Sequence, residues 1–341
     1  MGAIQLLKHP GYAAFLVVLA MVFTAACTHT APVGADTGDR AVLNAVVTFD
    51  ALYELAMAVG GDRVSVKNIM PPGAEAHHFE PGARDLELLN TADLFIICGL
   101  GFEPWADSAV NAAANSRLVV CDASRGVDPI ELGNSGGEMR EVYEGTAVRA
   151  QGSGGGGHED HGDHEHHDHL NGSYDPHVWL SPACAVIMAR NIRDAFIEAD
   201  PDGADSYRRN FDEIALRLNE LTDDYAEKFE PLENRTIVTG HAVFAYLCRD
   251  FGLAQNSVEG VFAEGEPSAR ALAELVDFCR GNNVRTILAE ALASPLVAET
   301  LASEAGASVE MIYTMESAED GLSYLDRMEH NLEVIYKSLV E

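Results

Sequence analysis

Histidine and carboxylate side chains are concentrated in one short tract of this chain. Residues 158–169 read HEDHGDHEHHDH, with six histidines and five acids in twelve positions. Imidazole is a good ligand for zinc, copper and nickel, and the carboxylates keep the local field negative, so the tract is suited to gathering divalent cations. It has almost no apolar surface to bury and cannot offset the entropy of ordering, so we predict a disordered His/Gly-rich loop over about 133–172. We interpret six residues as auxiliary, interchangeable metal ligands: His158, His161, His164, His166, His167 and His169.

Two other interpretations of the tract are weaker. It is internal and acidic, which argues against an expression tag. His164 to His169 also match HxHxDH, the metal signature of metallo-β-lactamase-type hydrolases. That motif should follow a buried strand, whereas this copy follows a glycine-rich run over 152–157. A match within a segment made almost wholly of His, Asp and Glu arises from composition, so a defined metal site must use histidines in the folded parts of the chain.

Isolated polar residues recur where predicted strands end. In open α/β sheets, ligands bind beyond the carboxyl ends of the strands. His77 lies in the proline-rich loop after one predicted strand, His241 follows another, and Glu316 lies just past a third. His177 begins an ordered segment that Trp179 can anchor. We therefore take the three histidines as candidate ligands of one metal ion.

Two sets of alternating strands and helices are needed to position these residues. Strands are predicted over 42–48, 64–70, 94–98 and 118–121 in the first set, and over 236–239, 257–262, 284–289 and 308–313 in the second. Repeated strand–helix units predict parallel sheets covered on both faces. An apolar stripe predicts a helix over 204–229, which at 1.5 Å per residue is about 39 Å long and can connect two lobes. The fold class we predict is α/β, with two lobes that each hold a parallel sheet flanked by helices, joined by one long rigid helix.

The amino-terminal residues have the pattern of a secretion signal. Lys8 is followed by an apolar run over 11–26, and no Asp, Glu, Lys or Arg occurs between Lys8 and Asp36. Thr24-Ala25-Ala26-Cys27 resembles a bacterial lipobox, in which Cys27 becomes the lipidated first residue of the mature protein. A plain signal peptide cleaved nearby is the alternative. In either case we predict an extracytoplasmic protein, and in the first case one anchored by lipid to the bacterial cell membrane.

Charge and cysteine content exclude other classes of protein. The net charge of −32 over 341 residues argues against nucleic acid as a partner, because its phosphates would be repelled. It fits a surface that attracts cations. The remaining cysteines are odd in number, form no CxxC pair and lie mostly in apolar runs, so we predict buried thiols at Cys98, Cys121, Cys184, Cys248 and Cys279.

Four segments together make the chain resemble a known family. They read PPGAEAHHFEP, DPHVWLSP, TGHAVFAYL and LSYLDRMEHNL, and the resemblance runs from about Leu43 to Glu341. The chain looks like the zinc- and manganese-binding lipoproteins that serve ABC metal importers, which include periplasmic zinc-binding proteins and streptococcal manganese adhesins. The resemblance implies the metal-type periplasmic binding protein fold, a monomer without enzymatic activity, and the permease and ATPase subunits of the importer as partners.

The resemblance also implies a ligand set. His77, His177 and His241 become the primary ligands, and the fourth family ligand falls on Glu316, where many relatives have Asp. Family members carry a histidine-rich loop between the first two ligands mainly when they handle zinc. Three imidazoles with one carboxylate or water favour tetrahedral Zn²⁺, whereas manganese sites of the family replace one histidine by a carboxylate. We therefore expect Zn²⁺, with Mn²⁺ as second choice.

Other residues lie near the predicted ligands. His78 doubles the first histidine and could compete with His77. Three acids at the same predicted edge are interpreted as orienting the imidazoles or as surface charge: Glu80, Glu264 and Glu290. Ser181 stands where relatives often have Asp, and serine can cap the following helix equally well.

The expected organisation follows from these points. We predict a signal peptide over 1–26, a lipid-anchored tether over 27–40, an N-terminal metal-binding lobe over 41–202, a linking helix over 203–230 and a C-terminal metal-binding lobe over 231–341. The leading hypothesis is a protein that captures zinc between its lobes and delivers it to a permease. The alternatives are a manganese-specific binding protein or adhesin of the same family, a passive cation buffer in which the tract is the main binder, and a secreted zinc-dependent hydrolase. No HExxH motif supports the last of these.

Overall fold

A computed structural model of the chain describes residues 42–74, 76–132, 174–261, 268–290, 295–318 and 321–340. The predicted signal peptide, Cys27, the tether, the histidine tract and Glu264 lie outside the described residues. The residues from Val42 to Glu341 form one compact unit. Within the described ranges, no helix combines the length and the apolar character needed to cross a membrane.

Two parallel four-stranded sheets form the framework. The first contains β1 (Leu43–Val47), β2 (Val64–Asn68), β3 (Leu94–Ile97) and β4 (Val119–Asp122), in the order β2-β1-β3-β4. The second contains β5 (Thr236–His241), β6 (Ala254–Glu259), β7 (Thr286–Glu290) and β8 (Ser308–Ile312), in the order β6-β5-β7-β8. Every pair of neighbouring strands is parallel, as the strand–helix alternation predicted. In each sheet, the second strand in the chain lies on one side of the first strand, and the third and fourth lie on the other side. Each sheet therefore has a switch point next to its first strand, and ligands of such sheets bind there.

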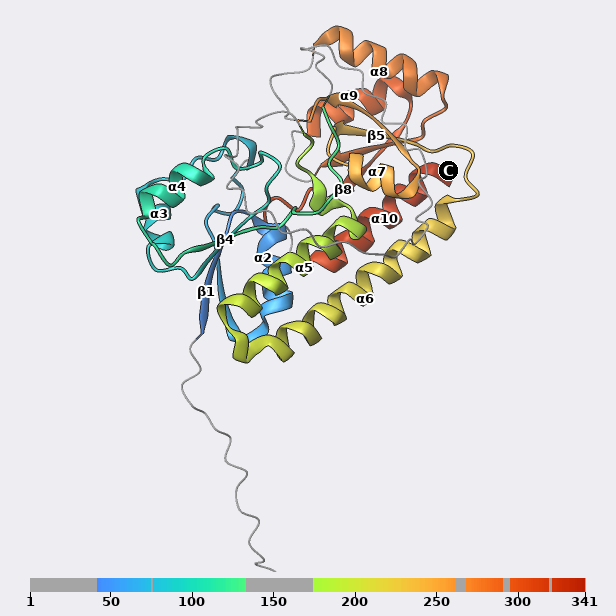
Figure 1. The fold of residues 1–341 in the computed structure, drawn as a ribbon. Helices are drawn as coiled ribbons and strands as arrows, with labels where there is room; N and C mark the ends of the chain where they lie inside the picture. Colours follow the sequence, from blue (N-terminus) through green and yellow to red (C-terminus); the bar gives the residue numbers. More distant parts are fainter. Residues whose placement is uncertain are drawn as a thin grey trace, which may run out of the picture. The chain divides into compact units, whose positions relative to one another are not determined.

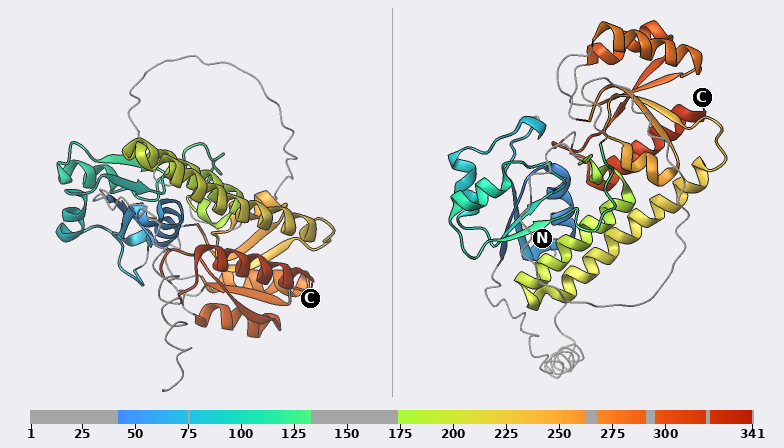
Figure 2. Two further views of the ribbon diagram at one scale, coloured as in Figure 1. Left: turned by 90° about the horizontal axis from the view of Figure 1, so that it is seen from below. Right: turned by 45° about the horizontal axis from the view of Figure 1, so that its top comes forward.

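Helices connect the strands of both sheets (Figures 1 and 2). The first half contains α2 (Asp50–Gly60), α3 (Ala83–Leu89), α4 (Ala106–Ala113) and α5 (Pro182–Ala199), and the second half contains α7 (Ala245–Phe251), α8 (Ala269–Gly281), α9 (Pro295–Ala305) and α10 (Tyr324–Val340). Short 3₁₀ turns occur at η1 (Gly61–Arg63), η2 (Ala76–His78), η3 (Val178–Leu180) and η4 (Pro201–Gly203). Two of these turns, η2 and η3, adjoin or contain candidate histidines.

The long helix α6 (Ala204–Phe229) packs against elements of both halves. It lies beside α5 in each view of the ribbon (Figures 1 and 2). Near its start, Asn210 donates a side-chain hydrogen bond to the carbonyl of Val59 at the end of α2. At its other end, the ring of Phe229 lies 5.3 Å from the ring of Phe251 in α7. The predicted connecting helix is therefore present, with the residue range that its apolar stripe indicated.

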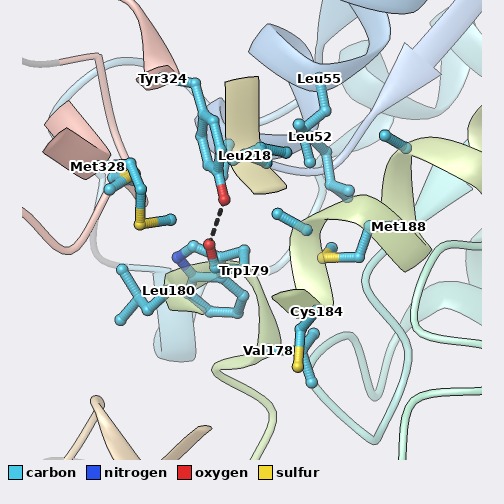
Figure 3. Close-up of a cluster of buried hydrophobic side chains, with 14 of the residues drawn as sticks. Leu52, Leu55, Val178, Trp179, Leu180, Cys184, Met188, Leu218, Tyr324 and Met328 are labelled. Carbon is cyan, nitrogen blue, oxygen red and sulfur yellow. Dashed lines mark hydrogen bonds between the residues drawn. The ribbon is translucent and has the colours of Figure 1, made fainter. Parts of the chain in front are cut away.

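The largest hydrophobic cluster is shared by the two halves and is centred near Trp179. Figure 3 shows this side chain among apolar residues of α2, α5, α6 and α10, including Leu52, Met188, Leu218 and Met328. The hydroxyl of Tyr324 donates a hydrogen bond to the carbonyl of Trp179. The indole nitrogen of Trp179 in turn donates to the carbonyl of Thr314, at 2.7 Å. These contacts fix the segment that carries His177, as predicted from the apolar residues beside it.

Seven of the eight strands differ from their predicted bounds by one or two residues, and the strand predicted over 257–262 differs by three. Strand β6 begins at Ala254 rather than near residue 257, because Gln255 and Asn256 belong to the strand despite their polarity. Gln255 is buried, and its amide group bonds the Thr239 hydroxyl and the His241 carbonyl. Helix α7 begins only at Ala245, because the backbone N–H of Ala242 continues the sheet pairing to Glu259. Helix α8 begins at Ala269, after Ser268 caps it by accepting from the N–H of Ala271.

The predicted state of the cysteines is confirmed for those in the described ranges. Five free cysteines are buried there: Cys98, Cys121, Cys184, Cys248 and Cys279. Burial raises the pKa of the Cys121 and Cys184 thiols to about 12. These thiols are therefore protonated near neutral pH and act as small apolar side chains.

Candidate metal centre

Three histidines from distant parts of the sequence lie together at the carboxyl ends of the strands. One ring nitrogen each of His77, His177 and His241 lies within 4.8 Å of the other two. The ring centroids are 5.1 Å apart for His77 and His177, 5.6 Å for His77 and His241, and 5.5 Å for His177 and His241. Among the residues described, this is the one group of three or more His, Cys, Asp or Glu side chains that could hold an ion.

The triad draws on both sheets. His77 belongs to the turn η2, in the loop after β2 of the first sheet. His241 is the last residue of β5, the central strand of the second sheet at its switch point. His177 precedes η3, in the segment that leads into α5. An ion held by all three rings would therefore be bound by both halves of the unit.

His177 is the most rigidly held of the three. Its ring is fully buried, and Nδ1 lies 2.9 Å from Oδ1 of Asp175, which also accepts the backbone N–H of His177. The carboxylate accepts a hydrogen bond from Nδ1, so the ring proton stays on Nδ1 and the lone pair is on Nε2, which lies 3.2 Å from Nε2 of His77. Burial lowers the pKa of His177 to about 3, so the ring is neutral at physiological pH. A neutral imidazole is the form that binds a metal ion.

Asp175 is held in turn by the second half of the unit. The hydroxyl of Tyr246, in α7, donates to the carbonyl of Asp175 at 2.6 Å and accepts from the N–H of Ile130. Burial raises the pKa of Asp175 to about 7, opposed by the hydrogen bond from the backbone of His177. Oδ2 of Asp175 is buried and has no hydrogen-bond partner. Such a costly arrangement is consistent with a carboxylate kept to orient an imidazole.

His241 is fixed mainly through its backbone. Oε1 of Glu290, at the end of β7, accepts the N–H of His241 at 2.9 Å. The carbonyl of His241 accepts from the Thr239 hydroxyl and from the Gln255 amide. Its Nε2 lies 2.8 Å from the carbonyl of Val261, and a proton on Nε2 that serves this bond leaves the lone pair on Nδ1. Glu290 thus supports the strand end that carries His241.

His77 is less buried than the other two and is positioned by its loop. Its ring meets the ring of Phe102 edge-on at 5.5 Å between centroids. The loop is tied to the second half, since the N–H of Gly73 donates to the hydroxyl of Ser317 at 2.6 Å. The neighbouring His78 is exposed and is not part of the triad, and Glu80 is exposed as well.

A buried glutamate lies at the switch point of each sheet. In the first sheet, Oε1 of Glu103 accepts from the Thr48 hydroxyl at 2.5 Å and from the N–H of Cys98 at 2.8 Å. Glu290 has the corresponding place in the second sheet. Burial raises the pKa of each glutamate to about 7, against the opposing effect of the hydrogen bonds they accept. Both side chains therefore join the ends of two neighbouring strands and rigidify the edge where the histidines meet.

Glu316 lies on the same edge but outside the compact group. Its side chain is buried, and its carbonyl accepts the N–H of Asp50 at 3.3 Å. The set of ligand atoms within 4.8 Å of one another contains the three histidines and not the Glu316 carboxylate. Its role as fourth ligand therefore stays a prediction.

Sequence reasoning assigned no role to Asp175 or Glu103. The segment Asp175-Pro176-His177 carried a usable signal, because a carboxylate two residues before a ligand can reach the far side of its ring. Nothing in the sequence distinguishes Glu103 from the many surface acids, since its importance arises from burial against Thr48.

The fold and the site together define a metal-binding protein with two parallel sheets that converge on one histidine cluster. Residues 45–338 match the model of a protein family described as the periplasmic component A of zinc-uptake complexes. The chain belongs to this family. Its described fold is that of the family, and the family is a transport component rather than an enzyme, so the hydrolase alternative is not supported.

Individual relatives agree with this membership. The chain is 41% identical over 319 residues to a candidate metal-binding protein of Treponema pallidum strain Nichols, covering 93% of each protein. It is 31% identical over 331 residues to the high-affinity zinc uptake system protein ZnuA of Bacillus subtilis strain 168, covering 96% of this chain and 97% of that protein. Among solved structures, the laminin-binding protein Lmb of Streptococcus agalactiae, described as a bifunctional adhesin with metal-transporting activity, is 31% identical. It superposes with a TM-score of 0.70 over 87% of this chain and 99% of its own.

Proposed function

We propose that this chain captures Zn²⁺ with His77, His177 and His241 and delivers it to the permease of an ABC importer. The observation that carries the proposal is the convergence of three ring nitrogens, within 4.8 Å of one another, from both sheets of the unit. Nitrogen-rich sites of this kind suit zinc better than manganese, which prefers oxygen ligands. The zinc uptake role named for the B. subtilis relative supports the same cargo.

Glu316 is the fourth ligand in this proposal. It follows β8 at the same edge as the triad, and its side chain is buried there. Three imidazoles and one carboxylate complete a tetrahedral shell. Manganese is the second candidate cargo, and a water in place of Glu316 is the alternative fourth ligand.

The remaining parts of the chain have supporting roles in the proposal. A lipid on Cys27 holds the protein at the outer face of the cytoplasmic membrane, with residues 27–40 as tether. The six histidines of residues 158–169 gather cations near the site with interchangeable ligands. Lobes over 41–202 and 231–341, linked by the helix within 203–230, close on the ion in a monomer.

Zinc affinity of single-site variants tests the proposal. Dissociation constants are measured by competition with a chelating dye for the wild type, His177→Ala and His330→Ala. His330 is the control because it lies outside the triad, with its Nε2 near the carbonyl of Met311. We expect His177→Ala to weaken zinc binding by more than about 100-fold, which exceeds the usual effect of altering an outer-shell partner. An unchanged dissociation constant in His177→Ala would remove that residue from the site.

Deletion of residues 158–169 separates capture from buffering. We expect the deleted protein to retain one tightly bound zinc ion, because the triad lies outside the deletion. If nearly all binding disappeared, the tract would be the main binder and the protein a passive buffer. Elemental analysis of protein purified without added metal, together with native mass spectrometry, identifies the ion and the stoichiometry.

A further inference from the structure

The segment Thr314–Ser317, which we call the crossing segment, follows β8 of the second sheet but is bound to the first half of the unit. The carbonyls of Met315 and Glu316 accept the N–H groups of Ala51 and Asp50, at 3.0 and 3.3 Å. These donors belong to the first turn of α2, where backbone N–H groups lack partners within the helix. Phe49, the residue before α2, supplies no side-chain cap. The crossing segment therefore caps α2 with its backbone.

The crossing segment has a conformation that its own sequence disfavours. Met315 is buried and has a φ of +58°, in the left-handed region that side chains other than glycine seldom adopt. A residue held there costs on the order of 1–3 kcal/mol and persists only when its surroundings impose it. Contacts with residues outside the crossing segment must therefore stabilise the turn at Met315 that positions Glu316.

Arg327, in the first turn of α10, is the side chain best placed to do so. Its Nη2 donates to Oδ2 of Asp50 at 2.7 Å, and its Nη1 donates to the carbonyl of Ser317 at 3.3 Å. The side chains of Arg327 and Asp50 are only 2% and 6% exposed. One guanidinium group thus joins α10, the start of α2 and the end of the crossing segment, which a single-point ammonium group could not do as well.

The buried pair is difficult to explain as a source of stability. Removing an arginine and an aspartate from water costs several kcal/mol per ion, and apolar replacements of similar volume are often as stable. Nε of Arg327 is also buried without a hydrogen-bond partner, which adds to the cost. Glu54, one turn further along α2, lies near both Asp50 and Arg327, and burial together with the Asp50 charge raises its pKa. The Arg327–Asp50 pair thus joins the start of α10 to the start of α2.

We propose that Arg327 and Asp50 are positioning residues that hold the crossing segment so that Glu316 reaches the metal ion. This inference rests on the proposed role of Glu316 as fourth ligand. Arg327 acts through the backbone of Ser317, and Asp50 acts through both its carboxylate and its backbone N–H. Neither residue touches the ion.

A double-mutant cycle in the full chain tests the inference. Zinc dissociation constants are measured for the wild type, Arg327→Lys, Glu316→Gln and the double variant. Arg63→Lys is the matched control, because Arg63 forms the other well-shielded arginine–aspartate pair, with Asp200, and contacts Tyr207 rather than the crossing segment. We expect Arg327→Lys to weaken zinc binding by about 10-fold in the wild type and by less than about 2-fold once Glu316 is replaced. Arg63→Lys leaves zinc affinity unchanged.

Cobalt absorption supplies a readout that lowered stability alone does not change. The visible bands of bound Co²⁺ report the number and geometry of its ligands, so Arg327→Lys should shift them towards the spectrum of Glu316→Gln. Equal losses of zinc affinity in both backgrounds, or a wild-type cobalt spectrum in Arg327→Lys, would overturn the inference. If Arg327→Lys does not fold, Asp50→Asn takes its place in the same cycle.

The same measurements separate this inference from the proposed function. If His177→Ala abolishes tight binding while Glu316→Gln has no effect, zinc capture stands and the positioning role is refuted. If neither variant changes the dissociation constant, the proposed site itself is refuted.

Discussion

At the scale of single residues, His177 already has the protonation state and the orientation that a metal ligand needs. Burial keeps the ring of His177 neutral, and the Asp175 carboxylate at Nδ1 directs its lone pair to Nε2. A ligand that is already deprotonated loses no affinity to proton competition at neutral pH. In the proposed site, metal capture would therefore depend on Asp175 as well as on the histidine ligands themselves.

The buried Glu103 should affect the pH dependence of stability. Its pKa is about 7 in the folded protein and 4.5 ordinarily, so the folded state binds the proton more tightly. Its contribution to stability is thus greatest below pH 4.5 and declines as the pH rises to 7. We expect Glu103→Gln to flatten the fall in unfolding free energy across this window, measured by denaturant titration of metal-free protein.

Exposed Glu80 provides the control for that measurement. Glu80→Gln makes the same replacement at an exposed position, so the Glu103→Gln profile is compared with that variant as well as with the wild type. A Glu103→Gln profile parallel to the wild type would contradict the assignment. Glu290 and Asp175, whose pKa values burial also raises to about 7, contribute to the slope that remains.

The sequence predicted the triad but not its supporting residues, for a physical reason. His77, His177 and His241 follow strands or precede an anchored turn, and chain position alone indicates where strand ends meet. Asp175, Glu103 and Arg327 matter because of what surrounds them in the folded unit. Burial of a charged side chain depends on contacts between residues far apart in the chain, which local patterns do not record.

At the scale of elements, capping determines where the site-bearing helices begin. Ser181 accepts the N–H of Cys184 at the start of α5, so serine caps this helix as predicted. Its hydroxyl also donates to Asp250 at the end of α7. One side chain therefore starts α5, a few residues after His177, and ties it to the second half of the unit.

Ser181→Ala should cost more stability than an ordinary cap. Loss of a serine cap costs about 1 kcal/mol, and the Asp250 carboxylate additionally loses a buried donor. Ser268→Ala is the matched control, because Ser268 caps α8 in the same way at an exposed position. We expect the melting temperature to fall further in Ser181→Ala than in Ser268→Ala, and equal decreases would show that the bond to Asp250 contributes nothing.

Elements with strong periodicity were predicted well, whereas polar strands were not. Helix α6 has the predicted range because its stripe, which includes Tyr207, Phe211 and Leu218, repeats at the helical period. Strand β6 was displaced by three residues in the prediction, because Gln255 and Asn256 resemble loop residues. Both are buried strand residues instead, and the side chain of Gln255 forms hydrogen bonds with Thr239 and with the N–H of Phe244.

At the scale of the whole molecule, the ion would act as a link between two halves that are already joined. The hydrophobic cluster around Trp179, the helix α6 and the Arg327–Asp50 pair connect elements of both halves without any metal. Zinc should therefore add to an existing stability rather than create the fold. This distinguishes the protein from small zinc domains that are unfolded without metal.

Zinc should raise the unfolding temperature by an amount that grows with the logarithm of the ratio of free zinc to its dissociation constant. Free zinc at 1,000 times the dissociation constant stabilises a folded protein by about 4 kcal/mol if the unfolded chain does not bind it. We expect this increase in wild-type protein by differential scanning calorimetry, its loss in His177→Ala, and a folded metal-free protein in both. A metal-free wild type without a cooperative transition would contradict the independence of fold and cargo.

The first two triad members are 100 residues apart in the chain, and the third belongs to a strand still further along. A polypeptide threaded out of the cell amino end first has no complete site until β5 has emerged and paired. A nascent or truncated chain without β5 would therefore lack the proposed triad, although it could already carry the histidine tract over 158–169. A proteolytic cut that let the halves separate would likewise separate the triad histidines and, under the proposed function, release the bound ion.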